Sequence, residues 1–244
     1  MNRSTILASV FGSSFALAGA AFAAPTAEMA FTGAGKGSNV KIVFNGNSFN
    51  AFSGQLKHTI SGATGLNSVI NGDRRTFCID LSQHVNKNTN TYEIVDIVAE
   101  VSGISPAFAG VRGAAISGIY NTFGSAAIGS TNATSNDFAA AFQLAVWELA
   151  YDFTGVASSI NLAAGVASFK KTDGSALSGG ILTQFNNIIS AVGNGPVAAG
   201  LVALRSGNYQ DQLVYVPGTL IPSAGSAAMA ALGGLLIARR RRGR

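Results

Sequence analysis

One stretch, residues 137–152, limits the possible fold more than any other part of this sequence. It has the length and composition of a helix, and it follows Ser135 and Asn136, which are both favourable helix N-cap residues. Between its terminal aspartates, only Gln143 and Glu148 carry strongly polar side chains. A helix that is apolar nearly all round is buried, and a buried amide without a partner costs about 1–3 kcal/mol. Gln143 must therefore be hydrogen-bonded or consumed by a reaction.

The remaining segments predict an α+β fold, an antiparallel β-sheet or sandwich with this buried central helix and additional helices. Alternating apolar residues and an Asn45-Gly46 turn favour strands before the helix, and a short strand closes the domain. The expected strands are 40–44, 51–60, 72–81, 91–101 and 212–216, with 91–101 paired to the strand that carries Cys78. The expected helices are 107–123, 137–152 and 181–192. These elements make one domain over 40–216, preceded by a loose N-terminal segment at 24–39.

The two ends of the chain have the patterns of targeting segments. Residues 1–23 have the pattern of a secretory signal peptide, with Arg3, an apolar run at 6–20 and the small-x-small cleavage pattern Ala21-Phe22-Ala23. Residues 217–244 contain an uncharged stretch at 219–238, just long enough to span a bilayer, and then an arginine cluster that favours the cytoplasmic side. The sequence therefore predicts an exported chain with a C-terminal anchor in the inner membrane.

This tail resembles the PEP-CTERM class of bacterial sorting signals. Its proline motif, small-residue-rich span and terminal arginines follow the order of that class, with Pro222-Ser223-Ala224 where the class has Pro-Glu-Pro. The resemblance implies processing by an exosortase-like enzyme and a final location on the cell surface or in the extracellular matrix.

The distribution of charge argues against a nucleic-acid partner. Of sixteen Lys and Arg, six lie at the ends, at position 3, at 239–242 and at 244. The chain between has ten basic and eleven acidic residues, so it lacks an excess of positive charge for binding phosphates. Only 11% of the residues are charged, which is typical of an exported, weakly charged protein.

Cys78 is the only cysteine, so an intramolecular disulfide is impossible and its thiol needs an explanation. In the run Phe77-Cys78-Ile79-Asp80, strand alternation puts Cys78 and Asp80 on one face and the bulky apolar residues on the other. Together with Gln143 and the run Ala145-Val146-Trp147, this pattern resembles the thioester domains of bacterial surface adhesins. In that family a cysteine is joined to the glutamine of a Thr-Gln-x-Ala-aliphatic-Trp motif, and here Phe142 stands in the threonine position.

The resemblance implies an internal thioester between Cys78 and Gln143, in a domain of roughly residues 40–216. Such a covalent adhesin or matrix protein acylates an amine or hydroxyl on a surface, matrix or host partner, once and without a cofactor. Trp147 lies one helical turn after Gln143 and is expected to shield the bond. Asp80 is a candidate for assisting proton transfer, and an exposed carboxylate is its simpler interpretation.

Two other functions are compatible with the same residues. In a passive structural protein of the envelope or matrix, Cys78 is an inert apolar residue and Gln143 a hydrogen-bonded core amide. In a Cys-His hydrolase, Cys78 acts with His58 or His84, but no oxyanion motif or orienting third residue accompanies them. One cysteine and two histidines also lack the spacing of a metal site. An intramolecular bond at Cys78 distinguishes the adhesin from the passive protein.

Overall fold

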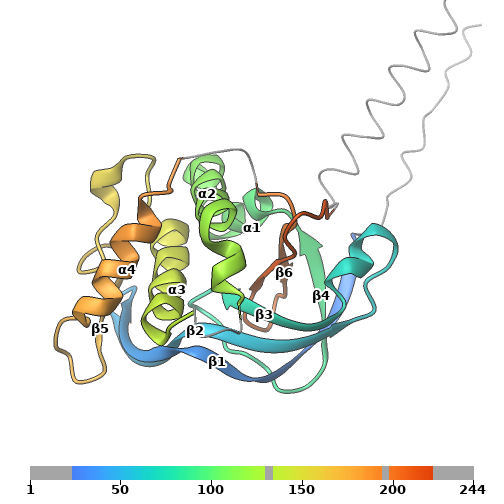
Figure 1. Ribbon diagram of the computed structural model, residues 1–244, viewed down its shortest axis with the longest axis horizontal. Helices are drawn as coiled ribbons and strands as arrows, with labels where there is room; N and C mark the ends of the chain where they lie inside the picture. The colour runs from blue at the N-terminus through green and yellow to red at the C-terminus, as the bar shows by residue number, and fades with distance from the viewer. Residues whose placement is uncertain (1–23, 130–133, 194–197, 222–244) are drawn as a thin grey trace, which may run out of the picture.

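The computed structural model describes residues 24–129, 134–193 and 198–221, which form one mixed α+β unit (Figure 1). The strands are β1 (Thr26–Phe44), β2 (Asn47–Ser61), β3 (Gly72–Cys78), β4 (Asn90–Val95), β5 (Ala167–Lys171), β6 (Leu201–Arg205) and β7 (Gln212–Tyr215). The α-helices are α1 (Ile97–Ile104), α2 (Ala109–Ala127), α3 (Asn136–Tyr151) and α4 (Gly179–Ile189). The α+β class predicted from the sequence is confirmed.

The seven strands form one antiparallel sheet in the order β2-β3-β7-β6-β4-β1-β5. Because β1 pairs with β2 as well as with β4, the strands β1, β2, β3, β7, β6 and β4 close into a ring. Strand β5 adds to the second half of β1, between Val40 and Phe44. The β1–β2 hairpin turns at Asn45 and Gly46, whose φ angles of 49° and 79° are those that a two-residue turn requires. The predicted antiparallel sheet is thus present, closed on itself rather than split into a sandwich.

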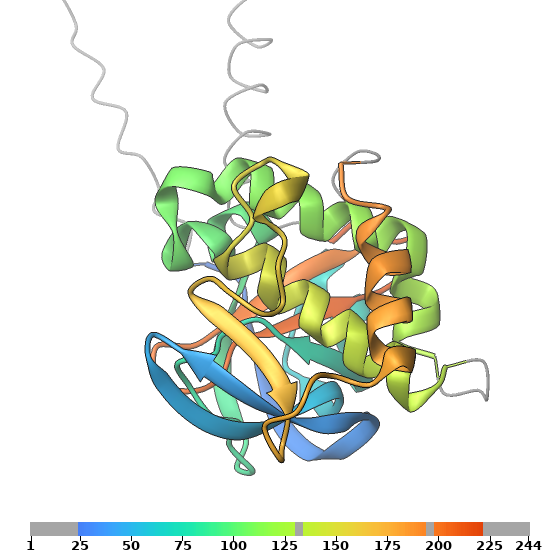
Figure 2. The same ribbon diagram turned by 90° about the vertical axis from the view of Figure 1, so that its left-hand side faces the viewer.

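The closed sheet separates two apolar cores. Alternate residues of the strands, such as Met29, Ile60 and Leu204, fill the inside of the ring. The helices cover the outer face, with α3 packed between α2 and α4 and against β1 and β2 (Figures 1 and 2). The second core fills the space between these helices and the sheet.

Helix α3 is the buried central helix that the sequence predicts. Ser135 caps it, since its Oγ accepts a hydrogen bond from the Phe138 N–H at 3.0 Å. Every residue from Ala139 to Leu149 is buried, including the two polar ones, Gln143 and Glu148. The sequence pattern alone therefore predicts that this helix is buried.

The prediction of a loose segment at 24–39 is wrong, because most of it belongs to strand β1. Register shifts against β2 occur at Phe31/Gly33 and Ala34/Gly37, so the side chains show no simple alternation in the sequence. Glu28 and Met29 pair with β2 on one side and with β4 on the other. Pairing on two sides orders a segment whose composition alone suggests little structure.

The predicted strand at 91–101 is wrong beyond Val95. Asp96 ends β4 and starts helix α1, where its side chain accepts a hydrogen bond from the Ala99 N–H at 2.8 Å. Ile97 and Val101 lie one turn apart, and both are buried. The predicted pairing is also wrong, because β4 pairs with β1 and β6, whereas the Cys78 strand pairs with β2 and β7.

The sequence pattern does not predict β5 and β6. Strand β6 lies between β7 and β4 and is buried on both faces, so it lacks the alternation that marks a half-exposed strand. Among the residues described, no helix is both long and apolar enough to cross a membrane. The predicted signal at 1–23 and the tail from residue 222 onward lie outside the described residues.

Candidate functional site

The Gln143 side chain binds the backbone of Cys78 through two reciprocal hydrogen bonds. The Cys78 N–H donates to Gln143 Oε1 at 2.9 Å, and Gln143 Nε2 donates to the Cys78 carbonyl at 2.7 Å. The two residues are 65 apart in the sequence, and both are buried. The fold thus places the one amide side chain buried within helix α3 directly beside the only cysteine.

The course of β3 explains why Cys78 has room for this partner. The β2–β3 pairing ends at Leu56 and Thr76, so β2 leaves the side of Cys78 unpaired. On the opposite side, the Ile79 N–H donates to the Asp211 carbonyl at 3.1 Å, which continues the pairing with β7. Since backbone groups alternate along a strand, the Cys78 N–H and carbonyl point to the side that β2 has left. Gln143 occupies the place of a strand there.

The Cys78 thiol is 2% exposed and donates a hydrogen bond to the Asp80 carbonyl at 3.0 Å. Burial raises the pKa of the Cys78 thiol well above its ordinary value; the Trp147 indole opposes this shift, and the charges of Asp80 and Asp211 add to it. At neutral pH the sulfur is therefore a protonated thiol. Its hydrogen-bond partner is the Asp80 backbone rather than the Gln143 amide.

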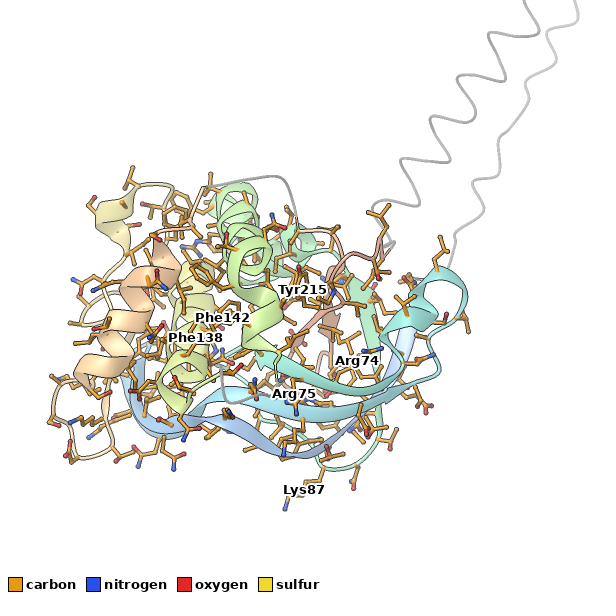
Figure 3. The ribbon with its side chains drawn as sticks, in the orientation of Figure 1. Arg74, Arg75, Lys87, Phe138, Phe142 and Tyr215 are labelled. Carbon is orange, nitrogen blue, oxygen red and sulfur yellow. The ribbon has the colours of Figure 1, made fainter. Side chains whose placement is uncertain are left out.

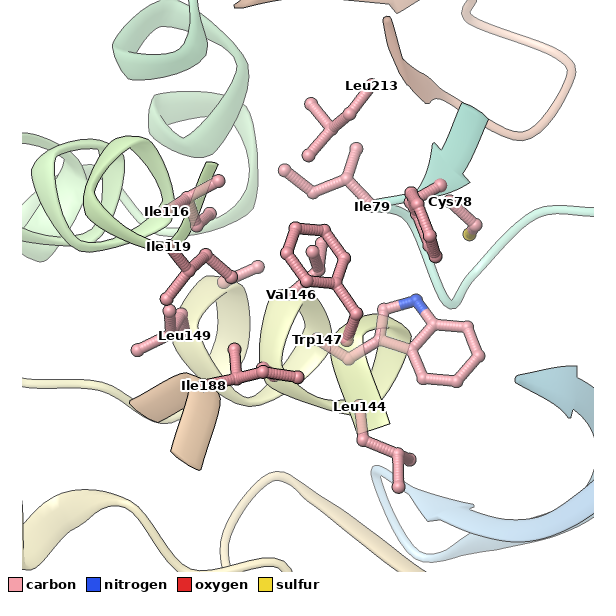
Figure 4. Close-up of a cluster of buried hydrophobic side chains, with 14 of the residues drawn as sticks. Cys78, Ile79, Ile116, Ile119, Leu144, Val146, Trp147, Leu149, Ile188 and Leu213 are labelled. Carbon is pink, nitrogen blue, oxygen red and sulfur yellow. The ribbon is translucent and has the colours of Figure 1, made fainter. Parts of the chain in front are cut away.

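Trp147 covers the Cys78 site from α3. The indole is 1% exposed and stacks on Phe169 of β5, with ring centroids 5.9 Å apart and an interplanar angle of 8°. Figure 4 shows its nitrogen on the side of Cys78, where it favours the thiolate without making a hydrogen bond of ordinary geometry. The large ring thus separates the sulfur from solvent on this side.

Phe142, at the position of the family's threonine, belongs to an aromatic cluster. Its ring lies 4.8 Å from that of Phe77 and 5.0 Å from that of Tyr120, and Phe138 stacks on it from the preceding turn (Figure 3). A phenyl ring forms no hydrogen bond to the carboxamide of its neighbour Gln143. Residue 142 therefore contributes packing here.

Asp80 is buried, with 8% of its surface exposed, so its interpretation as an exposed carboxylate is wrong. Its Oδ1 accepts hydrogen bonds from the Ser82 N–H and Oγ, each at 2.7 Å, and from the Tyr151 hydroxyl at 3.2 Å. The Tyr151 hydroxyl in turn accepts from the Leu81 N–H at 2.9 Å. Strand β3 ends at Cys78, and this turn directs the Asp80 carboxylate toward Tyr151 while its carbonyl holds the thiol.

A cavity of about 210 Å³ reaches Cys78. Cys78 and Trp147 both line this cavity, and the chain after β3 forms one wall of it through Leu81, Gln83, His84 and Val85. Gln210 holds this wall: its Nε2 donates to the carbonyls of Asp80 and Gln83, and its N–H donates to the His84 carbonyl at 3.1 Å. This cavity is therefore an approach to the thiol.

The two histidines do not form a catalytic pair with Cys78. His84 lines the cavity, but it makes no hydrogen bond to the thiol in the part of the chain that the structure describes. The Nδ1–H of His58 donates to Thr76 Oγ1 at 2.9 Å, and Thr76 donates to Gln212 Oε1 at 2.9 Å. Burial lowers the pKa of His58 to about 4, so its imidazole is neutral. The described residues also contain no cluster of three metal-ligating side chains.

Sequence reasoning missed two residues of the site, Tyr151 and Gln210. Tyr151 lies two turns after Gln143 on the same helix, so helical spacing is a signal that points to it. Gln210 has no such signal, because its role follows from how the β6–β7 connection packs on the chain after β3. The remaining polar residue of the helix, Glu148, accepts a hydrogen bond from the Asn161 N–H, and burial raises its pKa to about 7.

Comparisons with protein-family models, with curated proteins and with solved structures give no match for this chain. The function proposed below rests on the geometry of the site and on the sequence patterns.

Proposed function

We propose that this chain is an exported, surface-anchored protein that forms an internal thioester between Cys78 and Gln143 and attaches covalently to a partner. The reciprocal hydrogen bonds between these residues carry the proposal, because they hold the carboxamide against the one residue with a nucleophilic thiol. The partner supplies an amine or hydroxyl from a surface, matrix or host molecule. The reaction runs once per molecule, so the chain is not an enzyme in the sense of turnover.

In the first step, the Cys78 sulfur attacks the carboxamide carbon of Gln143. A carbon–sulfur bond forms, the carbon–nitrogen bond breaks, and the thiol proton leaves with the amide nitrogen as ammonia. Negative charge develops on Gln143 Oε1, where the Cys78 N–H already donates at 2.9 Å. That hydrogen bond stabilises the oxyanion, and it remains possible in the thioester, whose carbonyl oxygen is the same atom.

In the second step, a partner nucleophile attacks the same carbonyl carbon. A bond to nitrogen or oxygen forms, and Cys78 leaves as a thiol with the proton that the nucleophile loses. Burial beneath Trp147 protects the bond from water until then, while the 210 Å³ cavity admits a small nucleophilic group.

The two ends of the chain supply the location in this proposal. The signal at 1–23 exports the chain, the span at 219–238 holds the precursor in the inner membrane, and an exosortase-like enzyme releases or transfers it. The final location is the cell surface or the extracellular matrix.

The second candidate function is a passive structural protein of the envelope or matrix. One observation favours it: both polar atoms of the Gln143 amide already have hydrogen-bond partners in the Cys78 backbone. Pairing with the unpaired side of β3 is then a sufficient reason for a buried glutamine at this position. In that case Cys78 remains a thiol throughout the life of the protein.

The mass of the intact full-length chain, purified in a non-ionic detergent, distinguishes the two. We expect the wild type to be lighter than its sequence by one ammonia, and methylamine to add to it while one free thiol appears. The Cys78→Ala and Gln143→Ala chains should show neither change. A wild-type mass equal to the sequence, with a titratable thiol before methylamine is added, contradicts the thioester and favours the passive protein.

A further inference from the structure

A second and larger cleft, of about 770 Å³, lies beside the Cys78 site without containing the thiol. Asp80 and Ser82 line this cleft, whereas Leu81 and Gln83 line the small cavity at Cys78. The chain after β3 is thus a shared wall, with alternate residues facing alternate sides. The opposite walls come from α1 and from the β6–β7 connection.

The cleft has more carboxyl groups than cations to balance them. Arg205 forms a salt bridge to Glu93 at 2.6 Å. Three further carboxyl groups line the cleft, those of Asp80, Glu100 and Asp211, and none forms a salt bridge within the part of the chain that the structure describes. An excess of buried negative charge disfavours the empty state of the cleft.

Glu100 is the most unusual of these groups. It is 2% exposed, and its Oε2 receives no N–H or hydroxyl hydrogen bond from the described residues. Its close neighbour is the Asp211 carboxyl. Burial, together with the charge of Asp211, raises the pKa of Glu100, and burial likewise raises the pKa of Asp211. Two such carboxyl groups share a proton when no other cation is present.

We propose that this cleft binds an organic cation, a primary ammonium group on a short alkyl chain, beside the carboxyl groups of Glu100 and Asp211. An ammonium offers three N–H donors to carboxylate oxygens that lack them. Phe44, Ile104 and Tyr151 supply apolar and aromatic wall for the alkyl part. A bare metal ion fits less well, because the described residues hold no group of three metal-ligating side chains in suitable positions. The inference goes beyond the proposed function and holds whether or not the thioester forms.

Isothermal titration calorimetry of the full-length chain with 1,4-diaminobutane tests the proposal. We expect saturable binding at pH 7, with proton release detected from the dependence of the heat on the buffer's ionisation enthalpy. Affinity should rise with pH as the shared proton is lost; the other titratable or charged groups near the pair are Asp80, Glu93, Arg205, Tyr92, Tyr151 and Cys78. The neutral analogue 1,4-butanediol should not bind.

Two variants keep the shape of the cleft while they remove charge. Glu100→Gln should weaken diamine binding about tenfold or more and abolish proton release, and Asp211→Asn should act in the same direction. Glu28→Gln removes an exposed carboxylate outside the cleft and should bind like the wild type. The absence of saturable diamine binding, unchanged binding in both cleft variants, or binding of Ca²⁺ in place of the diamine would each overturn the proposal. None of these outcomes depends on the mass experiment at Gln143.

Discussion

Gln143 and Cys78 are joined by two hydrogen bonds, in which the side-chain amide pairs with the backbone of β3 as a neighbouring strand would. The arrangement satisfies the backbone of β3 where β2 departs, and it also holds a carboxamide against the backbone of the only cysteine. The structural and the chemical interpretations of Gln143 therefore share one geometry. Stability and reactivity must be measured separately to tell them apart.

The first prediction concerns the structural part of this pair. Gln143→Ala leaves the Cys78 N–H and carbonyl buried without partners, which we expect to cost about 2–4 kcal/mol in the free energy of unfolding. Gln143→Glu retains the shape and one acceptor, so its loss should be smaller at low pH, where the new carboxyl is protonated and donates. Urea denaturation of the three chains at pH 5 measures this. Equal stability of wild type and Gln143→Ala would contradict the role of the amide as a strand partner.

Arg112 provides a test of how α3 is positioned. This buried guanidinium on α2 donates at 2.7–2.8 Å to three carbonyls at the C-terminal end of α3, those of Ala150, Tyr151 and Phe153. Arg112→Met should lower the free energy of unfolding by about 2–4 kcal/mol, because these helix-end carbonyls lose their donors. Lys87→Met, in an exposed position of the β3–β4 connection, is the control and should stay close to the wild type in thermal unfolding.

Gln210 holds one wall of the Cys78 cavity. Its Nε2 donates to the carbonyls of Asp80 and Gln83, so Gln210→Ala should let the wall of the cavity open more often. Made in the Gln143→Glu chain, which lacks the reactive amide, it should raise the rate of thiol labelling at Cys78 at least about tenfold. Unfolding curves of both chains check that the increase is local. An unchanged labelling rate would mean that the nucleophile approaches elsewhere.

His58 makes stability depend on pH. Its imidazole has a pKa near 6.5 in the unfolded chain, and burial lowers the pKa to about 4 in the fold. The unfolded state therefore binds the proton first, so stability is complete above about pH 6.5 and falls as the pH drops toward 4. The loss has an upper limit of about 1.4 kcal/mol per pH unit. Urea midpoints from pH 4 to 7 should show a steeper decline for the wild type than for His58→Gln.

Phe142 tests how far the motif resemblance extends. Phe142→Thr restores the residue of the adhesin motif but removes a ring that packs on Phe77 and Tyr120. We expect it to destabilise the fold by about 3 kcal/mol. Calorimetric melting temperatures of wild type and variant provide the comparison. A gain in stability would show instead that a hydroxyl at this position forms bonds that outweigh the lost packing.

Much of the fold follows from local signals in the sequence. The apolar helix with its Ser135 cap, the Asn45-Gly46 turn and the alternation before Cys78 all correspond to elements of the structure. The error at 91–101 has a local cause as well, because Asp96 can cap a helix or lie in a strand, and only packing of Ile97 and Val101 decides between them. The sequence of β6 does not alternate between apolar and polar residues, because both faces of this strand are buried.

The sequence by itself determined that Gln143 would be a buried amide in need of a partner and that Cys78 would have no second cysteine for a disulfide. Only the tertiary structure decided that each is the other's neighbour, that Asp80 is buried, and that Gln210 holds one wall of the cavity. The physical reason is that burial and periodicity are properties of a few consecutive residues. Where the pairing of β2 with β3 ends, and which helix then bonds the unpaired backbone, depend on contacts between segments far apart in the chain.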